Sequence, residues 1–266
     1  MKSTSLSKSD IRFHYDLATP LYWLVWGPHI HHGYWERGDE TPAKARIDLI
    51  NGLACLAGVC WADDVIDVGC GMGGASVHLA SHYGCSVCGI TLSPVQAWIA
   101  RARALWHRPY RWHGAGCRFL CADVEKLDVP QCSADVVWSV ECTEHLFDKP
   151  GFFRNAASWL RPGGKLAIAA WLGENPPEFL CPSLGTLESY QQWMTDAGLR
   201  MTGVEEVGAK VWKTWEICER RMRYFKWLGW LGGRRMKTFV DSFGKIKDAL
   251  RDGRMQYGLF AAVKEG

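Results

Sequence analysis

The sequence has 266 residues, of which 48% are hydrophobic, and a formal net charge of +3. This length fits one large α/β domain, and the hydrophobic content is high enough to bury a sizeable core, which excludes a disordered chain. Such a small net charge gives no argument for nucleic acid as a partner.

The 11 cysteines are odd in number and scattered, unlike those of a short secreted domain held together by disulfides. Cys85 and Cys88 form a C-x-x-C pair without a second ligand pair, so we interpret them as strand packing rather than as a metal site. The polar residues 1–7 lack the apolar stretch of a signal peptide, and no run approaches the roughly 18 apolar residues of a membrane span. We expect a reduced, cytoplasmic protein.

The first half of the chain alternates between strand and helix patterns. An aromatic and histidine-rich segment over 11–35 precedes a helix that Thr41 caps and Pro42 begins. Strands are then predicted over 65–68, 85–91, 117–122, 134–140 and 165–171, and helices over 75–83, 93–106 and 152–160. This rhythm is typical of βαβ units in a parallel, doubly wound sheet.

Beyond residue 171 the alternation stops. A loop over 174–177 leads to a helix that Thr186 caps and Gly198 ends. We predict a strand over 200–208, a basic helical region over 211–251 with a glycine-rich interruption, and a closing strand over 255–264.

A glycine-rich loop, Asp67-Val68-Gly69-Cys70-Gly71-Met72-Gly73-Gly74, follows a strand and opens a helix. Glycine lets the backbone approach a ligand closely, and a helix N-terminus presents free N–H groups. Gly69, Gly71 and Gly74 also satisfy the dinucleotide fingerprint G-x-G-x-x-G, so the glycines alone do not identify the ligand.

Three features together resemble class I S-adenosylmethionine (SAM)-dependent methyltransferases rather than dehydrogenases. Asp67 stands two residues before the first glycine. The strand end Cys121-Ala122-Asp123-Val124 follows at a distance suited to an adenine edge, and Leu160-Arg161-Pro162-Gly163-Gly164-Lys165-Leu166 turns into the fifth strand. The resemblance implies SAM as cofactor and an α/β, Rossmann-like sheet in one structural domain. An N-terminal helical cover would occupy 1–60, the SAM-binding core 61–172, and the remaining strands with an inserted helical cap 173–266.

Other stretches resemble the tocopherol O-methyltransferase-like branch, which is also similar to sugar, alkaloid and terpenoid methyltransferases. These stretches are 13–16, 31–35, 89–96 and 137–145. In this branch the first helices fold over SAM, which implies that Tyr15 and Tyr34 help to enclose it. Aromatic faces in a desolvated pocket hold a sulfonium cation at about 1–2 kcal/mol each.

Nearby aromatic residues have another interpretation. We expect Tyr22, Trp23, Trp26 and Trp35 to pack a lid onto the core. The alternate spacing of His29, His31 and His32 on a loop is weak support for a metal, and we expect none.

The resemblance and the motifs give a set of cofactor-binding residues. They are Tyr15, Tyr34, Asp67, Gly69, Gly71, Gly73, Thr91, Gln96, Asp123, Val124 and Ser139. One departure from the family pattern concerns the ribose hydroxyls. Many relatives end the second strand with Asp or Glu, whereas here Thr91 and the backbone after it would take over, or ribose is held elsewhere.

Candidate catalytic groups follow the fourth strand: Glu141, Glu144 and His145, at the carboxyl edge where α/β sheets bind ligands. Methyl transfer needs mainly position and exclusion of water, and a base helps where the acceptor must lose a proton. We expect a new helix here, with His145 as the base. Alternatively, His145 bonds a loop carbonyl, Glu141 holds the edge of the SAM site, and Glu144 only favours the helix N-terminus.

The 15 tryptophans favour an enclosed pocket for a small apolar acceptor. A prenylated phenol, terpenoid or sterol-like compound is the first expectation. N-methylation of a small amine or alkaloid and C-methylation of a prenyl diphosphate are alternatives, and a non-catalytic SAM-binding module acting through a partner is a further one. Nucleic acid is not expected as a substrate, because Asn175-Pro176-Pro177-Glu178 lacks the aromatic residue of the motif that binds base amines.

The segment 220–237 is rich in arginine, lysine and aromatic residues. It fits a cap helix with solvated arginines, a peripheral contact with an anionic membrane surface, or a clamp in which Arg220, Arg221 or Arg223 grips a diphosphate.

Overall fold

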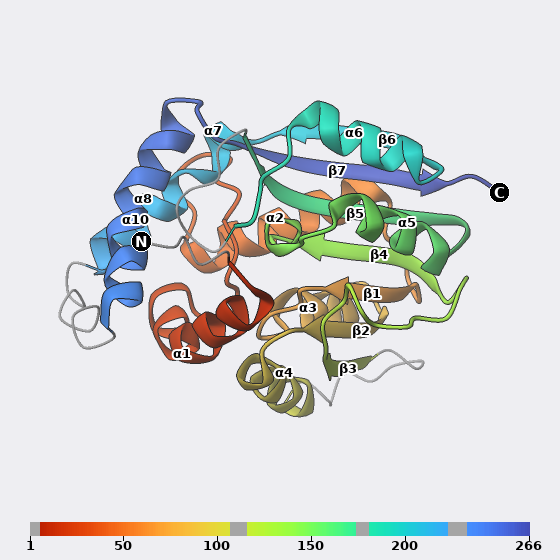
Figure 1. The fold of residues 1–266 in the computed structure, drawn as a ribbon, viewed down its shortest axis with the longest axis horizontal. Helices are drawn as coiled ribbons and strands as arrows, with labels where there is room; N and C mark the ends of the chain where they lie inside the picture. Colours follow the sequence, from red (N-terminus) through yellow and green to blue (C-terminus); the bar gives the residue numbers. More distant parts are fainter. Residues whose placement is uncertain (1–5, 107–115, 174–180, 223–232) are drawn as a thin grey trace.

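The computed structural model describes residues 6–106, 116–173, 181–222 and 233–266 (Figure 1). These residues form a seven-stranded sheet in the order β3-β2-β1-β4-β5-β7-β6. The strands are β1 (Asp64–Val68), β2 (Ser86–Thr91), β3 (Gly116–Cys121), β4 (Ala134–Val140), β5 (Leu160–Leu172), β6 (Leu199–Glu206) and β7 (Gln256–Lys264). Strands β1 to β5 pair in parallel, and β7 runs antiparallel to β5 and β6. The strand order reverses between β1 and β4, where open sheets of this kind bind ligands.

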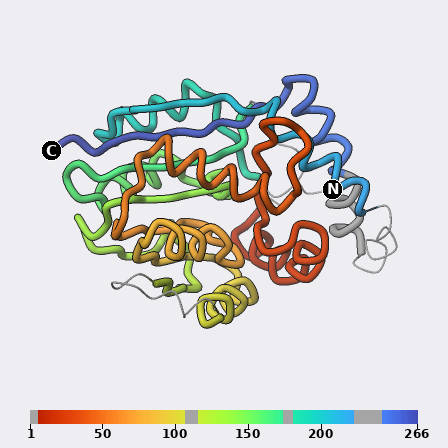
Figure 2. Tube along the Cα trace, turned by 180° about the vertical axis from the view of Figure 1, so that it is seen from behind, coloured from red at the N-terminus to blue at the C-terminus, as the bar shows by residue number. Residues whose placement is uncertain are grey.

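Helices cover both faces of the sheet, as Figures 1 and 2 show. One face carries α2 (Pro42–Ala57), α3 (Gly74–His82) and α4 (Pro94–Trp106), and the other carries α5 (Lys149–Trp159) and α6 (Leu187–Asp196). Strand β4 shows why both faces are buried. Val136 and Trp138 pack in the cluster with α2, whereas Val137 packs in the cluster with α5. This alternation places an apolar core on each side.

A helical cover lies at one end of the sheet, at the left in Figure 1. It consists of α1 (Lys8–Trp26), α8 (Lys213–Met222) and α10 (Gly233–Arg251), with the short α7 (Gly208–Val211) leading into it. Tyr22 and Trp26 of α1 pack with Trp215 and Phe243 in a separate buried cluster. The N-terminal and C-terminal parts of the chain therefore build the cover together. No helix in the described ranges has the length and apolar character needed to span a bilayer.

The expected Rossmann-like fold is confirmed, with differences at element ends. Strand β5 begins at Leu160, which pairs with Ala134 before the register shifts and Lys165 pairs with Val136. The prediction of a new helix at His145 is wrong. Residues Thr143–His145 form a single 3-10 turn, η2, and α5 begins only at Lys149, because Asp148 caps it by accepting a bond from the Gly151 N–H. The expected loop at 174–177 and much of the basic segment 220–237 lie outside the described residues.

Candidate functional site

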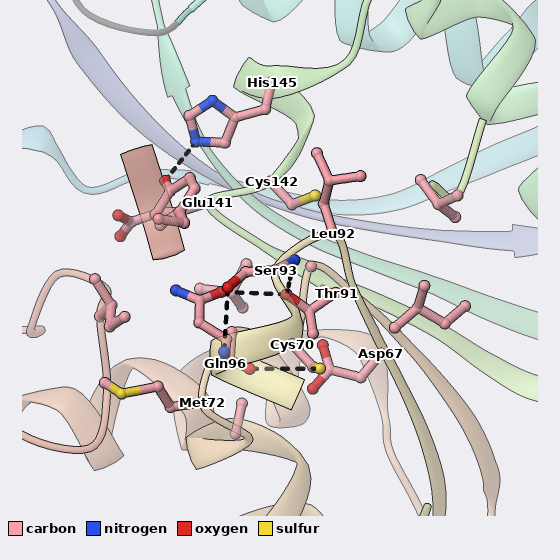
Figure 3. Close-up of a pocket in the computed structure, with 18 of the residues that line it drawn as sticks. Asp67, Cys70, Met72, Thr91, Leu92, Ser93, Gln96, Glu141, Cys142 and His145 are labelled. Carbon is pink, nitrogen blue, oxygen red and sulfur yellow. Dashed lines mark hydrogen bonds between the residues drawn. The ribbon is translucent and has the colours of Figure 1, made fainter. Parts of the chain in front are cut away.

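The first cavity lies at the carboxyl ends of β1, β2, β3 and β4, under α1 and the segment that follows it (Figure 3). It has about 980 Å³ of empty space, including the part open to solvent. Of the expected site residues, it is lined by Tyr15, Asp67, Gly69, Gly71, Thr91, Gln96, Asp123, Val124, Glu141 and His145. The structure thus brings together ten side chains or backbone positions that lie up to 130 residues apart in the sequence.

The glycine loop forms the floor of this cavity. Gly69 and Gly71 have φ values of 77° and 53°, in the left-handed region that favours glycine. A Cβ at Gly69 would lie 2.4 Å from the Cys142 side chain, so no side chain fits there. A Cβ at Gly71 would meet no protein atom within 4 Å. Because Gly71 lines the cavity, that open space is the space a ligand would take.

Asp67 lies at the end of β1, beneath the loop, and is 2% exposed. Its carboxylate accepts a hydrogen bond from the Ser76 hydroxyl at the start of α3. Burial raises the pKa of Asp67 to about 7, although the bond from Ser76 acts in the opposite direction. The acid is therefore held in place beside the cavity and is poorly solvated.

The end of β2 is organised by side chains rather than by an acid. The Thr91 hydroxyl donates to Gln96 Oε1 at 3.1 Å, and the Ser93 hydroxyl donates to Asp16 Oδ1 of α1. Gln96 keeps its amide nitrogen, which can only donate. Thr91 and Gln96 both line the cavity, so this corner offers hydroxyl and amide groups rather than a carboxylate.

At the end of β3, Asp123 and Val124 form the wall next to α1. The Lys8 ammonium lies 3.6 Å from Asp123 Oδ1 and also pairs with Glu125. Lys8 further donates to the His145 backbone oxygen at 3.3 Å. One residue of α1 thus bridges the β3 and β4 ends of the cavity.

Glu141 follows β4 and is the point where several elements meet. Its Oε1 accepts hydrogen bonds from the His32 backbone N–H (2.7 Å), His32 Nδ1 (2.7 Å) and the Tyr257 hydroxyl (2.8 Å). The indole N–H of Trp215 can only donate, so His32 Nε2 accepts its bond and Nδ1 carries the proton toward Glu141. Burial works to raise the pKa of Glu141, but the interactions with His32 and His31 together outweigh burial, and the pKa is lowered.

Glu144 and His145 lie in the 3-10 turn after β4. Glu144 is 3% exposed, and its Oε1 accepts the backbone N–H of Trp171 at 2.7 Å, so it does not serve a helix N-terminus. Burial raises the pKa of Glu144 to about 8. His145 Nε2 lies 2.7 Å from the Tyr15 hydroxyl, with the two rings edge to face. The imidazole is therefore oriented by a side chain of the cover.

A second cavity adjoins the first and has about 560 Å³ of empty space, including its open part. The two share Tyr15, Ile30, Glu141 and His145 in their linings. The other lining residues are mostly aromatic: Tyr22, Trp26, His32, Glu144, Trp171, Cys181 and Trp215. Tyr22 and Trp26 thus do more than pack the lid, while Trp35 is buried by packing and Trp23 is 47% exposed.

Some expected cofactor residues lie outside the first cavity. The Tyr34 hydroxyl accepts from Lys210 at 2.8 Å, and its backbone N–H donates to Ala45. Gly73 serves packing, since a Cβ there would lie 2.9 Å from Ala100 and Phe119. Ser139 is fully buried within β4. The cavity wall above the loop comes instead from residues 28–31, which the sequence reasoning did not assign to it.

The histidines of this wall are buried among one another. His29 Nδ1 lies 3.3 Å from His31 Nε2, and His31 Nδ1 lies 2.8 Å from the His32 backbone oxygen. Burial lowers the pKa of His31 to about 4 and that of His29 well below its ordinary value. Across the described ranges, no group of three or more His, Cys, Asp or Glu side chains could hold a metal ion.

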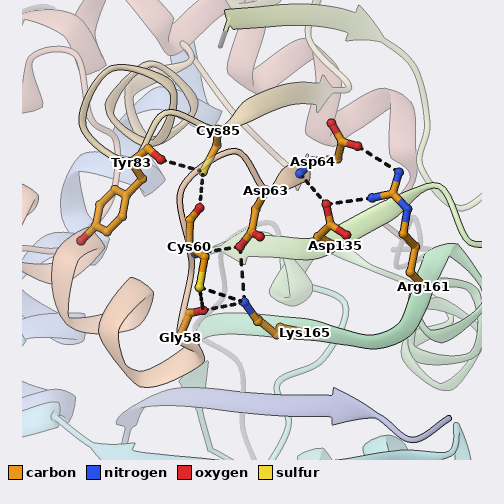
Figure 4. Close-up of polar contacts among 9 residues, drawn as sticks. All are labelled: Gly58, Cys60, Asp63, Asp64, Tyr83, Cys85, Asp135, Arg161 and Lys165. Carbon is orange, nitrogen blue, oxygen red and sulfur yellow. Dashed lines mark hydrogen bonds and ion pairs between the residues drawn. The ribbon is translucent and has the colours of Figure 1, made fainter. Parts of the chain in front are cut away.

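The third of the three sequence features, residues 160–166, lies at the amino ends of the strands, opposite the cavity. Arg161 binds Asp64 Oδ2 at 2.9 Å and Asp135 Oδ2 at 2.8 Å, and Asp135 also accepts the Asp64 N–H (Figure 4). Lys165 lies 3.4 Å from Asp63 on the same edge. These contacts join the amino ends of β1, β4 and β5, so the motif around Arg161 positions strands and does not touch the cavity.

Comparison with known proteins agrees with this geometry. Residues 66–168 match the family model described as "Methyltransferase domain". A 27-O-demethylrifamycin SV methyltransferase from Amycolatopsis mediterranei is 30% identical over 82% of this chain and 84% of that protein. The chain belongs to the class I SAM-dependent methyltransferases. Within them, a chloroplastic tocopherol O-methyltransferase from Arabidopsis thaliana is 33% identical over 65% of this methyltransferase chain, a match that spans only 52% of the Arabidopsis protein.

Among solved structures, the [4+2]-cyclase SpnF has a TM-score of 0.87 at 22% identity, covering 98% of this methyltransferase and 97% of that chain. At this identity the likeness shows the fold alone. It extends over the cover as well as the sheet.

The first cavity of this methyltransferase fits SAM. A Cβ at Gly71 would meet no protein atom within 4 Å, so a ligand has room against the backbone there. Asp67, Gly69 and Gly71 would hold the amino-acid end, Thr91 and Gln96 the ribose, and Asp123 and Val124 the adenine. When bound, SAM supplies a methyl group on a positively charged sulfur.

Replacing Gly71 with Ala tests this assignment. The added Cβ meets no protein atom, so beyond the backbone strain of a left-handed alanine it intrudes on the ligand's space. We expect S-adenosylhomocysteine (SAH) to bind at least tenfold more weakly, measured by isothermal titration. Gly58→Ala is the matched control, because Gly58 is also left-handed (φ 63°) and unobstructed but is remote from the cavity. If Gly71→Ala binds SAH as the wild type does, the cavity is misassigned.

Asp67 should make stability depend on pH. Its pKa is raised, so the folded protein keeps a proton that the unfolded chain releases, and the resulting stability is lost as pH rises from about 4 to about 7. Asp67→Asn removes this loss. In urea titrations, the free energy of unfolding of the variant minus that of the wild type should rise by on the order of 2 kcal/mol between about pH 5 and pH 8. The pKa of the Asp135 carboxyl is lowered instead, so for Asp135→Asn the difference in unfolding free energy from wild type should stay constant over that range.

Arg161→Met should destabilise the methyltransferase, because the guanidinium binds two carboxylates at the amino edge. Both pairs are partly exposed, so we expect a loss of only about 1 kcal/mol in urea unfolding. Arg200→Met breaks a single, more exposed pair with Glu265 and should cost less. Equal losses of stability from the two substitutions would show that the pairing of Arg161 with two carboxylates adds nothing beyond a single surface ion pair.

Proposed function

We propose that this protein transfers the methyl group of SAM to a small, largely apolar acceptor held in the second cavity. The observation that carries the proposal is the shared wall of the two cavities, formed by Tyr15, Ile30, Glu141 and His145. A donor in one cavity and an acceptor in the other would meet at this wall. Methyl transfer needs this kind of fixed approach with water excluded.

The lining of the second cavity favours the class of acceptor. Tyr22, Trp26, Trp171 and Trp215 offer ring faces and edges, which suit a prenylated phenol, a terpenoid or a sterol-like compound. The lining contains two carboxyl groups and, among the described residues, no lysine or arginine. This composition disfavours a diphosphate. Arg221 instead donates to the Val25 backbone oxygen, and Arg223 lies outside the described residues.

His145 is suited to accept a proton from the acceptor. It lies on the shared wall, and the Tyr15 hydroxyl at 2.7 Å fixes the position of its Nε2. In this proposal the imidazole takes the proton that an acceptor hydroxyl loses, and Tyr15 orients the ring. Glu141 accepts three hydrogen bonds on Oε1 and its pKa is lowered, so it holds the wall in place and is a poor base.

A methyl-transfer assay tests the proposed function. The protein is incubated with methyl-labelled SAM and, separately, a prenylated hydroquinone, an indole alkaloid amine and geranyl diphosphate. We expect label on the hydroquinone. If the protein binds SAH but labels none of the three compounds, the non-catalytic SAM-binding module becomes the better account.

The role of His145 has its own test. A base typically contributes 10²- to 10⁴-fold in rate, so His145→Ala should lower turnover by that order while SAH affinity stays close to wild type. Tyr15→Phe should lower turnover less, because the imidazole remains. The exposed His82→Ala is the control and should behave as wild type. Normal turnover by His145→Ala at every pH would exclude the base role.

A further inference from the structure

Two polar atoms of the second cavity's lining residues have no hydrogen-bond partner in the described part of the chain. They are Glu144 Oε2 and Trp171 Nε1, and both atoms are fully buried. A buried polar atom without a partner costs about 1–3 kcal/mol, so such atoms are uncommon and call for an explanation. Neither atom is used by the proton transfer proposed for His145.

The two groups belong to one wall of the cavity. Glu144 Oε1 accepts the backbone N–H of Trp171 at 2.7 Å, which fixes the carboxyl group beside the Trp171 position. The Trp171 ring is held in turn by edge contacts with His32 and Trp215, with centroids 5.5 and 5.8 Å away. Both unpartnered atoms are therefore on side chains that the surrounding structure orients.

The chemistry of the pair limits what can satisfy it. An indole N–H can only donate, so its partner must carry a lone pair. Burial raises the pKa of Glu144 to about 8, so near neutral pH the carboxyl keeps a proton. Since Oε1 is an acceptor, that proton resides on Oε2, which then donates as well. If Glu144 ionises, Oε2 becomes an acceptor.

We infer that the second cavity binds the acceptor molecule through a hydroxyl oxygen, which accepts a hydrogen bond from Trp171 Nε1 and makes a second one with Glu144 Oε2. The inference rests on the proposed function and adds the polar group by which the acceptor is recognised. A hydroxyl has lone pairs and a proton, so it satisfies Glu144 in either state. An ammonium group has no lone pair for Trp171, and a hydrocarbon satisfies neither atom. The acceptor class is thus a hydroxylated apolar compound such as a prenylated phenol.

Binding measurements with two probes test the inference. The probes are para-geranylphenol and geranylbenzene, which differ only by the hydroxyl, titrated into the SAH-loaded protein and followed by tryptophan fluorescence. Leaving the two polar atoms unpaired should make geranylbenzene bind about ten- to a hundredfold more weakly. Glu144→Leu and Trp171→Phe should each reduce this preference, and the double variant should abolish it. Glu144→Gln keeps a polar end and should retain most of it.

Cys181→Ala is the matched control, because Cys181 lines the same cavity without an unpartnered nitrogen or oxygen. It should change affinity for both probes alike. The inference is overturned if para-geranylphenol does not bind, if the wild type binds both probes equally, or if neither polar substitution reduces the preference. The proposed function can fail separately: a clear preference for the phenol without any methyl transfer would contradict catalysis and leave the hydroxyl site intact.

Discussion

The carboxylate of Glu141 is the contact on which the rest of the site depends. One oxygen holds the backbone and the ring of His32, in the segment between α1 and α2, and the hydroxyl of Tyr257 from β7. Glu141 adopts a left-handed φ of 51°, which a non-glycine residue takes at a cost of about 1–2 kcal/mol. We interpret the three hydrogen bonds as the compensation that keeps this conformation. Through them, a turn at the end of β4 fixes the cover over the carboxyl edge of the sheet.

The position of the cover determines which side chains line the two cavities. With His32 anchored, residues 28–31 form a wall of the first cavity, and Tyr15 of α1 reaches His145 on the shared wall. Trp215 of α8 donates to His32 and also lines the second cavity, so the C-terminal half of the cover depends on the same anchor. Glu141 itself has a lowered pKa and lines both cavities, which places negative charge at the wall that they share. The position of the cover, the orientation of His145 and the negative charge of Glu141 thus have one structural origin.

The sequence predicted the parts of the site that depend on local pattern. A strand, a glycine loop and a helix in succession identified Asp67, Gly69 and Gly71, and the strand ends identified Thr91, Asp123 and Val124 as residues of one edge. It could not predict contacts set by distant elements. Tyr34 was expected over the cofactor, but Lys210 from the C-terminal half holds its hydroxyl. Glu144 was interpreted by its proximity to a helix start, whereas its partner is the backbone of Trp171 in β5. The anchoring role of Glu141 required His32 and Tyr257, which no spacing in the sequence connects to it.

A crystal structure with SAH bound is the most direct measurement of whether the two cavities work as donor and acceptor sites. We expect adenine beside Asp123 and Val124, the amino-acid end over Gly69 and Gly71, and the sulfur directed at the wall shared by Tyr15, Glu141 and His145. SAH with its sulfur directed away from that wall, or bound at another place on the sheet, would show that the two cavities do not serve as donor and acceptor sites.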